Sequence, residues 1–221
     1  MNINFKPFTT SLMGSMPRSE KLITLHEDLA QGNINQETFD QQVLFETKEV
    51  VKMQEENGMD IIVHGELARD NYMSFVADKV DGIQLMTMEE IAGIATDKTN
   101  FEKSLEEMDA ADNSMNNPVA VKRIGTDSPL DYHEIKRLKT LTDHPVKATL
   151  PSPYLLTRSM WMDDITGQVY EDRRELGKDV VKLIVNEVRR LISLGVDIIQ
   201  IDEPILSDIV FNREEGSNSF Y

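Results

Sequence analysis

The 221 residues carry a formal net charge of -16, and they include 40% hydrophobic residues, 28% charged residues and no cysteine. This composition predicts one globular domain over residues 1–221, and the acidic charge argues against nucleic acid and membrane surfaces as partners. Without cysteine the chain can build neither disulfides nor a thiolate zinc site, and without a signal-like start or an apolar run of about 20 residues we expect a cytoplasmic protein.

The N-terminal segment predicts a strand, a glycine turn and a helix. Residues 8–13 form an apolar run of strand length, and Gly14 and Ser15 follow it directly. Pro17 is a favourable first residue for the helix that comes next. Because a glycine turn that opens into a helix N-terminus suits an anion, we expect this turn to hold one.

The rest of the chain alternates between helical segments and short apolar runs. A long helix is predicted over residues 36–57, and a buried strand follows over 59–63. The acidic segment 96–117 is interpreted as a solvated surface excursion. Further strands are predicted over residues 82–86, 119–124, 146–150 and 198–201. This alternation is typical of an α/β protein with a parallel sheet.

One unit of the sequence is repeated. Gly-Met-Asp-Ile-Ile at residues 58–62 recurs as Gly-Val-Asp-Ile-Ile at 195–199, each time after a long amphipathic helix. Glu66 and Glu203 each lie eight positions after the glycine, and Asp202 comes one residue before Glu203. In a (β/α)8 barrel the catalytic groups lie at the carboxyl ends of parallel strands, so these acids are expected to meet at one mouth. Any parallel α/β fold can repeat in a similar way.

Candidate strand ends of this kind occur five times along the chain, at Gly14-Ser15, Glu66, Asp127, Ser152 and Asp202. We therefore predict a TIM-type (β/α)8 barrel with about the first five of its eight units, because a complete barrel needs roughly 250 residues. An unclosed parallel sheet leaves an open edge, through which the chain is expected to associate with itself or with a partner chain.

Four motifs in chain order resemble the C-terminal catalytic barrel of the cobalamin-independent methionine synthases. They are Thr9–Arg18, Asp60–Glu66 with Arg69 after it, Pro145–Lys147 leading into Pro153, and Ile198–Pro204. The resemblance implies a methyltransferase of methionine biosynthesis that moves a methyl group from methyltetrahydrofolate, or a related donor, to homocysteine. It also implies that zinc activates the homocysteine thiol and that no cobalamin takes part.

The resemblance assigns substrate contacts residue by residue. Glu66 and Asp202 would hold the amino group of homocysteine or methionine, and a buried ammonium does need such anionic partners. The backbone around Met13, Gly14 and Ser15 would hold the carboxylate of the substrate. Without the resemblance, the two acids are as readily solvated loop residues or a helix cap. No catalytic residue is assigned.

Other polar residues near these motifs receive supporting roles. His64 is interpreted as a hydrogen-bonded neighbour of the site, because a lone histidine at a strand end is more often that than a metal ligand. Glu203 points away from Asp202 along an extended chain and is interpreted as its support. Arg69 and Lys147 could neutralise a carboxylate or a polyglutamate tail, but single basic residues are more often surface partners of acids.

Two features depart from the family pattern. The family stacks the pterin on a tryptophan where an ungapped overlay places Ser159, while Trp161, two positions later, either replaces that tryptophan or belongs to the core. His64, Trp161 and Glu203 are therefore candidates for folate contact or for support. The family's zinc ligands lie beyond the Asp-Glu-Pro motif, so we expect no metal ligand in this chain, and a thiol without zinc keeps a pKa near about 8.5.

Three functions stay open at this point. The first is a homocysteine methyltransferase that is incomplete as this chain. The second is a non-catalytic truncated barrel that binds an amino acid or a partner chain. The third is a different decarboxylase or thiol transferase on the same type of barrel, since a fold alone does not fix a reaction.

Overall fold

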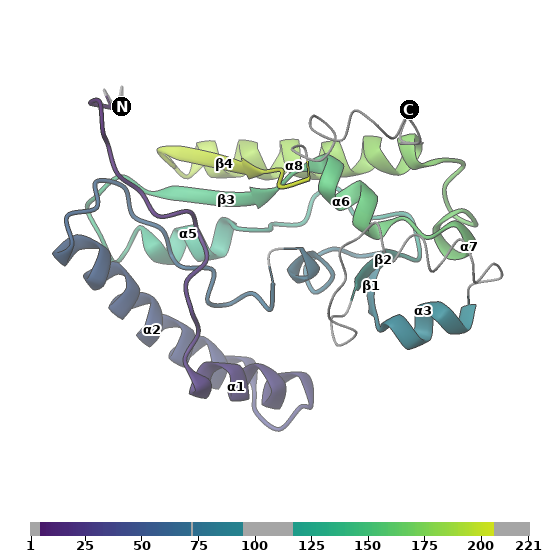
Figure 1. Cartoon of the computed structure of the whole chain (residues 1–221), viewed down its shortest axis with the longest axis horizontal. Helices are drawn as coiled ribbons and strands as arrows, with labels where there is room; N and C mark the ends of the chain where they lie inside the picture. The colour runs from purple at the N-terminus through teal and green to yellow at the C-terminus, as the bar shows by residue number, and fades with distance from the viewer. Residues whose placement is uncertain (1–4, 72, 95–116, 206–221) are drawn as a thin grey trace, which may run out of the picture.

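The computed structural model describes residues 5–71, 73–94 and 117–205 as an α/β chain (Figure 1). In chain order its elements are α1 (Glu20–Ala30), α2 (Gln36–Glu56), η1 (Ser74–Val76), β1 (Ile83–Met86), α3 (Met88–Ile94), β2 (Asn117–Ala120), α5 (Tyr132–Leu138), β3 (Lys147–Pro151), α6 (Pro153–Met160), α7 (Asp163–Thr166), α8 (Arg173–Ser193) and β4 (Ile198–Asp202). Within these residues, no helix has the length and apolar character needed to cross a membrane.

The parallel part of the fold is built from four chain segments. Strands β3 and β4 pair in parallel, from Lys147 opposite Ile198 to Pro151 opposite Asp202. On the other edge of β3, Val146 forms a parallel bridge with Ile62, and Ser11 forms one with Ile61. The strands predicted over 146–150 and 198–201 are therefore confirmed, and residues 59–63 join the same parallel arrangement through these bridges.

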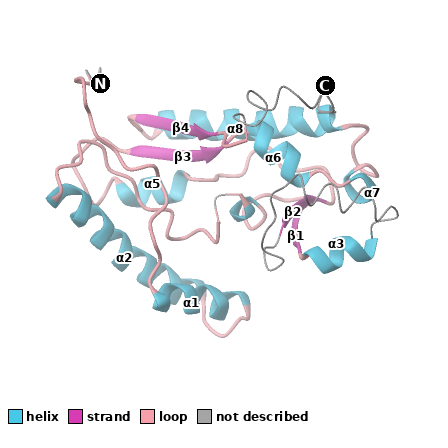
Figure 2. Ribbon diagram, in the orientation of Figure 1, coloured by secondary structure: helices cyan, strands magenta, loops and turns pink. Residues whose placement is uncertain are grey.

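The strand predicted over 119–124 does not join this arrangement. Strand β2 begins at Asn117 and pairs antiparallel with β1, and the pair lies apart from β3 and β4, beside α3 and α7 (Figure 2). Gly82 explains the local geometry, because its carbonyl accepts from the N–H groups of Val121 and Lys122 at 2.9 and 3.2 Å. A Cβ at Gly82 would lie 2.6 Å from the carbonyl oxygen of Arg123, so only glycine permits this close approach.

The count of five barrel units is therefore not confirmed. The described residues contain four parallel segments, and these do not close a barrel. Asp127 does not end a parallel strand but forms an ion pair with Arg190 of α8. The acidic segment predicted over 96–117 lies outside the described residues, apart from Asn117, which begins β2.

Glycine residues end the two long helices as predicted. Helices α2 and α8 each have 21 residues, and Gly58 and Gly195 follow them with φ values of +73° and +75°. Glycine adopts this left-handed conformation without the steric cost that a Cβ brings. The repeated unit of the sequence is thus a repeated helix ending.

Helix α1 begins later than predicted. Its first residue is Glu20 rather than Pro17, because Ser19 caps it by accepting from the N–H of Leu22 at 3.1 Å. The Gly14-Ser15 turn therefore does not open into a helix N-terminus. The N–H and hydroxyl of Ser19 instead donate to Glu46 of α2, so the helix N-terminus that was expected to favour an anion does not lie at this turn.

The two faces of the β3–β4 pair differ in chemistry. Ala148, Leu150 and Ile199 lie on the face that packs into the main hydrophobic core, where α8 contributes residues such as Leu183 and Ile184. Because side chains alternate along a strand, the opposite face carries polar groups. Those groups are Lys147 and Thr149 of β3, and Gln200 and Asp202 of β4.

Candidate active site

Glu66 and Gly14 lie in contact beside the polar face of the sheet. The Glu66 carboxylate is buried, and its Oε1 accepts from the hydroxyl of Thr149 at 2.7 Å. A Cβ built on Gly14 would lie only 2.6 Å from that same oxygen. The glycine of the first turn is therefore needed for the backbone to approach the carboxylate.

Asp202 is linked to the same turn through Gln200. Its Oδ1 accepts from the side-chain amide of Gln200 at 2.6 Å, and this amide also donates to the carbonyl of Met13 at 3.1 Å. Ser15 is exposed. Among the described residues, the only hydrogen-bond donor to the Asp202 carboxylate is Gln200, so this acid keeps capacity for a ligand.

Lys147 lies on the same polar face of the sheet as Thr149 and Asp202. Its ammonium donates to the carbonyl of Leu12, and burial lowers the pKa of Lys147 while Asp202 and Glu66 act in the opposite direction. Glu66 thus lies against Gly14, and Gln200 joins the Asp202 carboxylate to the carbonyl of Met13 in the same turn. That the two acids and this turn form one substrate site stays a prediction.

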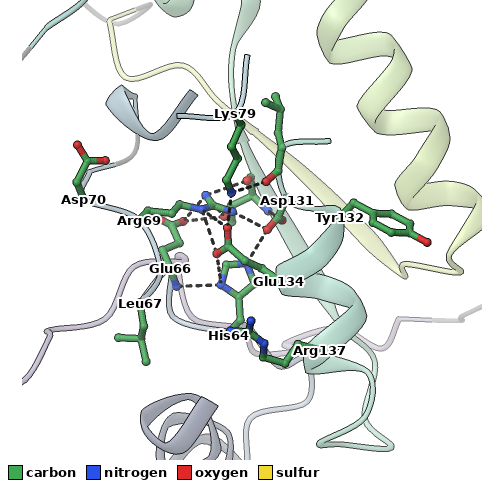
Figure 3. A network of polar contacts seen from close by, with 12 residues as sticks. His64, Glu66, Leu67, Arg69, Asp70, Lys79, Asp131, Tyr132, Glu134 and Arg137 are labelled. Atoms are coloured by element: carbon green, nitrogen blue, oxygen red, sulfur yellow. Dashed lines mark hydrogen bonds and ion pairs between the residues drawn. The ribbon is translucent and has the colours of Figure 1, made fainter. Parts of the chain in front are cut away.

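A buried network of ion pairs and hydrogen bonds contacts Glu66 (Figure 3). Arg69 is 2% exposed, and its Nη2 donates to Asp131 Oδ1 at 2.6 Å while its Nε lies 3.3 Å from both carboxylate oxygens of Glu134. Its Nη1 donates to Thr149 and lies 3.6 Å from Glu66 Oε1. The charges within the network are therefore paired, which buried charges require.

His64 lies within the same network and contacts three of its members. Its Nε2 is 3.0 Å from Asp131 Oδ1, and its Nδ1 is 3.4 Å from Glu134 Oε2. The backbone N–H of Glu66 donates to Nδ1 at 2.9 Å. His64 is thus a buried hydrogen-bonded histidine, as interpreted from the sequence, and it touches the backbone of a predicted substrate-binding residue.

The electrostatics of the network follow from this pairing. Burial alone would raise the pKa of Asp131, but Arg69 and His64 outweigh it and hold that pKa well below the usual range. Burial likewise opposes the charged form of Glu134, yet Arg69 and His64 keep its pKa low. For His64, burial lowers the pKa, but Asp131 and Glu134 outweigh it and hold the pKa above the usual value.

The only group in the described part of the chain that could hold a metal ion is His64, Asp131 and Glu134, whose ligand atoms lie within 4.8 Å of one another. Arg69 already supplies the positive charge that these carboxylates require, and both ring nitrogens of His64 are engaged. These residues also offer no thiolate. They therefore fit a charge-paired network rather than the zinc site that the family resemblance implies.

The remaining predicted residues lie at the edge of the site. Glu203 accepts from the hydroxyl of Ser152 through Oε2, and its Oε1 is buried without a hydrogen-bond partner among the described residues. The indole N–H of Trp161 donates to Asp163 at 2.7 Å, and the ring packs partly against the main core. Ser159 donates to the backbone of its own helix, at Leu155, at 2.8 Å.

Sequence reasoning misplaced two basic residues and missed several partners. Arg69 and Lys147 are buried rather than at the surface. The alternation of polar and apolar residues in β3 and β4 could have revealed two contacts on the polar face, Thr149 and Gln200. Asp131 and Glu134 carry no local signal, because their partner Arg69 lies more than 60 residues away.

Comparison with known proteins identifies the family. The model of the family described as "Cobalamin-independent synthase, Catalytic domain" matches residues 8–221. The chain belongs to this family. Its curated relatives include the 5-methyltetrahydropteroyltriglutamate–homocysteine methyltransferase of Thermotoga maritima, which is 27% identical over 203 residues, covering 91% of this chain and 25% of the relative. The enzyme of that name from Coxiella burnetii is 26% identical and covers 91% of this chain. The chain thus spans about a quarter of these relatives.

Two solved structures have a fold similar to that of this chain. A putative vitamin-B12-independent methionine synthase from Listeria monocytogenes matches 97% of this chain and 57% of its own, with a TM-score of 0.68 and 18% identity. A B12-independent methionine synthase from Shewanella, solved in complex with selenomethionine, matches 77% of this chain and 44% of its own, with a TM-score of 0.57 and 20% identity. At these identities, the likeness shows the fold.

Proposed function

We propose that this chain binds the amino-acid end of homocysteine or methionine in a cobalamin-independent methionine synthase. The protein would transfer a methyl group from a methyltetrahydropteroylglutamate to homocysteine. The observation that carries the proposal is that Glu66 lies against Gly14, while Gln200 joins the Asp202 carboxylate to the carbonyl of the preceding residue, Met13. Membership of the family and the names of the curated relatives supply the reaction.

The two acids suit a ligand ammonium. Thr149 and Arg69 occupy Oε1 of Glu66, and Gln200 occupies Oδ1 of Asp202, but the described residues donate no hydrogen bond to the second oxygen of either carboxylate. A substrate ammonium has three N–H donors and a charge that such oxygens stabilise. The backbone around Met13, Gly14 and Ser15 would then receive the carboxylate of the substrate.

Other parts of the proposal extend beyond the described residues. The four parallel segments would belong to a (β/α)8 barrel whose mouth holds this site. Zinc would supply a more nucleophilic thiolate, and the described residues do not form the site that would hold it. Trp161 and Glu203 stay candidates for contact with the methyl donor or for support, and cytoplasmic location and self-association stay predictions from the sequence.

Calorimetric titration of the full chain with L-methionine and L-homocysteine tests the binding site. Glu66→Gln and Asp202→Asn should each weaken binding by about 2–5 kcal/mol, because each removes one of the two charged partners of the ammonium. Glu56→Gln is the matched control, since Glu56 pairs with Lys52 in an ion pair whose side chains are both 64% exposed. Equal affinity of all three variants and the unaltered chain would remove both acids from the site.

Transfer of a labelled methyl group from 5-methyltetrahydropteroyltriglutamate to homocysteine tests the reaction itself. The assay is run with and without added zinc. Transfer that disappears in Glu66→Gln supports the proposed enzyme. Methionine binding without any transfer would favour the alternative, in which this chain binds an amino acid without catalysing the reaction.

A further inference from the structure

The conformation of Glu66 is unusual for its residue type. Its φ is +55°, a left-handed conformation that is sterically unfavourable for a residue with a Cβ. Gly65, immediately before it, has φ +83°. Such a conformation persists only when surrounding contacts hold it, and it often occurs at functional sites. The contacts that fix the Glu66 backbone therefore matter for where its carboxylate points.

A hydrogen bond from the backbone of Glu66 to the His64 ring holds this turn. The N–H of Glu66 donates to His64 Nδ1 at 2.9 Å, and the two residues are buried, with exposed fractions of 5% and 4%. The carbonyl of Glu66 accepts from Arg69 N–H at 3.1 Å and from Arg18 Nη2 at 3.1 Å. The His64 ring nitrogen thus fixes the N–H of Glu66, and the Arg18 guanidinium helps to fix its carbonyl.

His64 is itself oriented by the ionic network. Asp131 Oδ1 faces Nε2 at 3.0 Å, and Asp131 is fixed by Arg69 and by the N–H of Thr149, which donates to its Oδ2 at 3.2 Å. With Nε2–H directed to Asp131, Nδ1 carries the lone pair that the Glu66 N–H needs. The charged residues that contact this ring are Asp131 and Glu134 from the α5 region and Glu66, through its backbone N–H. Three more charged residues contact those partners, namely Arg69 of the same loop, Lys79 after η1 and Glu187 of α8.

We propose that His64 is a positioning residue whose unprotonated Nδ1 holds Glu66 in the left-handed turn that directs its carboxylate into the substrate site. The inference deepens the proposed function and rests on it for its effect on substrate. Nδ1 lies between a donor, the Glu66 N–H, and an acceptor, Glu134 Oε2, and it can serve only one of them at a time. When Nδ1 is protonated it becomes a hydrogen-bond donor to Glu134, and the Glu66 N–H loses its acceptor.

Two substitutions separate the two nitrogens of His64. Asparagine places its Oδ1 where Nδ1 lies, so His64→Asn keeps an acceptor for Glu66 but loses the contact to Asp131. Glutamine places its amide nitrogen near Nε2, so His64→Gln keeps the donor to Asp131 but loses the acceptor. We expect His64→Asn to bind methionine within a few-fold of the unaltered chain and His64→Gln to bind it roughly tenfold more weakly.

The pH dependence of binding supplies a second readout. Methionine affinity of the unaltered chain should rise between pH 6 and 8.5, because His64 loses the proton that competes with the Glu66 N–H, and its pKa lies above the usual value of about 6.5. His64→Asn should not show this rise, since an amide oxygen does not titrate. A rise of equal size in His64→Asn, or equal affinity of the asparagine and glutamine variants, would overturn the inference.

Nuclear magnetic resonance of the ¹⁵N-labelled histidine ring distinguishes failure of this inference from failure of the proposed function. In the ligand-free chain at pH 8.5, His64 Nδ1 should give the signal of an unprotonated nitrogen that accepts a hydrogen bond. If that signal is present but no variant or unaltered chain binds methionine, the positioning of Glu66 stands and the proposed substrate is wrong. A protonated Nδ1 at that pH would overturn the positioning role itself.

Discussion

Replacing Arg69 by methionine should cost more stability than any single surface change. The guanidinium lies 2.6 Å from Asp131, 3.3 Å from Glu134 and 3.6 Å from Glu66, and it is 2% exposed. Methionine keeps an unbranched apolar side chain but removes the charge and the guanidinium, which lies over the ring of Phe75 at 4.5 Å. Removing one partner of a buried ion pair costs about 3–5 kcal/mol, because the remaining charge stays buried and unpaired.

Urea unfolding at pH 7, followed by the fluorescence of the single tryptophan Trp161, measures this cost. Arg137→Met is the matched control, since Arg137 lies 3.8 Å from Asp40 and the two side chains are 27% and 45% exposed. An exposed pair of this kind contributes at most about 1 kcal/mol. The reasoning is refuted if the two variants lose equal stability with unchanged dependence on urea.

Lowering the pH should reduce the difference in free energy of unfolding between Arg69→Met and the unaltered chain. Because Arg69 lowers the pKa of Asp131 in the folded state, this carboxylate stabilises the fold above its unfolded pKa of about 3.9, and the stabilisation is lost as pH falls through the folded value. In Arg69→Met, the pKa of Asp131 is lowered much less, because the guanidinium is absent. The stability difference should therefore be largest near pH 7 and should shrink below about pH 4.

Three further changes have expected outcomes of their own. Gly14→Ala should weaken methionine binding in calorimetric titration, because its methyl would lie 2.6 Å from Glu66 Oε1, and overpacking of this kind costs about 1–3 kcal/mol; unchanged affinity would mean that the turn moves freely. Gly58→Ala should lose about 1–2 kcal/mol in urea unfolding from its φ of +73° alone, whereas Gly93→Ala, in α3 and equally open to a Cβ, should lose none. Asp131→Asn should unfold with less dependence on pH below about pH 4 than the unaltered chain, and an identical acid profile would contradict the charge pairing.

Local signals in the sequence were enough for the two long helices, α2 and α8, and for two strands. Helix α2 occupies Gln36–Glu56 because its apolar residues recur at helical spacing between the Asn35 cap and Gly58. Strands β3 and β4 are apolar runs bounded by turn residues, and both were found where they were predicted. In each case the deciding residues lie within a few positions of the element.

The direction of β2 could not be predicted in the same way. The apolar run that contains it fits a parallel or an antiparallel strand equally well. Its pairing with β1 depends on the approach of Gly82 to the backbone of Arg123, about 40 positions away along the chain. A single sequence shows each of these residues but not that they meet.

The same distinction between local signals and contacts of distant residues applies to the candidate site. The repeated unit indicated the two acidic strand ends, and the family resemblance assigned Glu66 and Asp202 to the substrate, an assignment that stays a prediction. Their supports were missed because a buried charge needs a partner from anywhere in the fold. Asp131 and Glu134 stand in a loop and a short helix, and only their contacts with Arg69 distinguish them from surface acids.

The dependence of Glu66 on this network links substrate binding to folding. Residues that hold its backbone and carboxylate come from three separate parts of the chain, around His64, Asp131 and Thr149. A ligand that binds only the folded state raises the free energy of unfolding by an amount set by its concentration and affinity. Methionine should therefore stabilise the unaltered chain against urea more than it stabilises His64→Gln, even where the two have equal stability without ligand. That difference, rather than stability alone, measures how far the network serves the site.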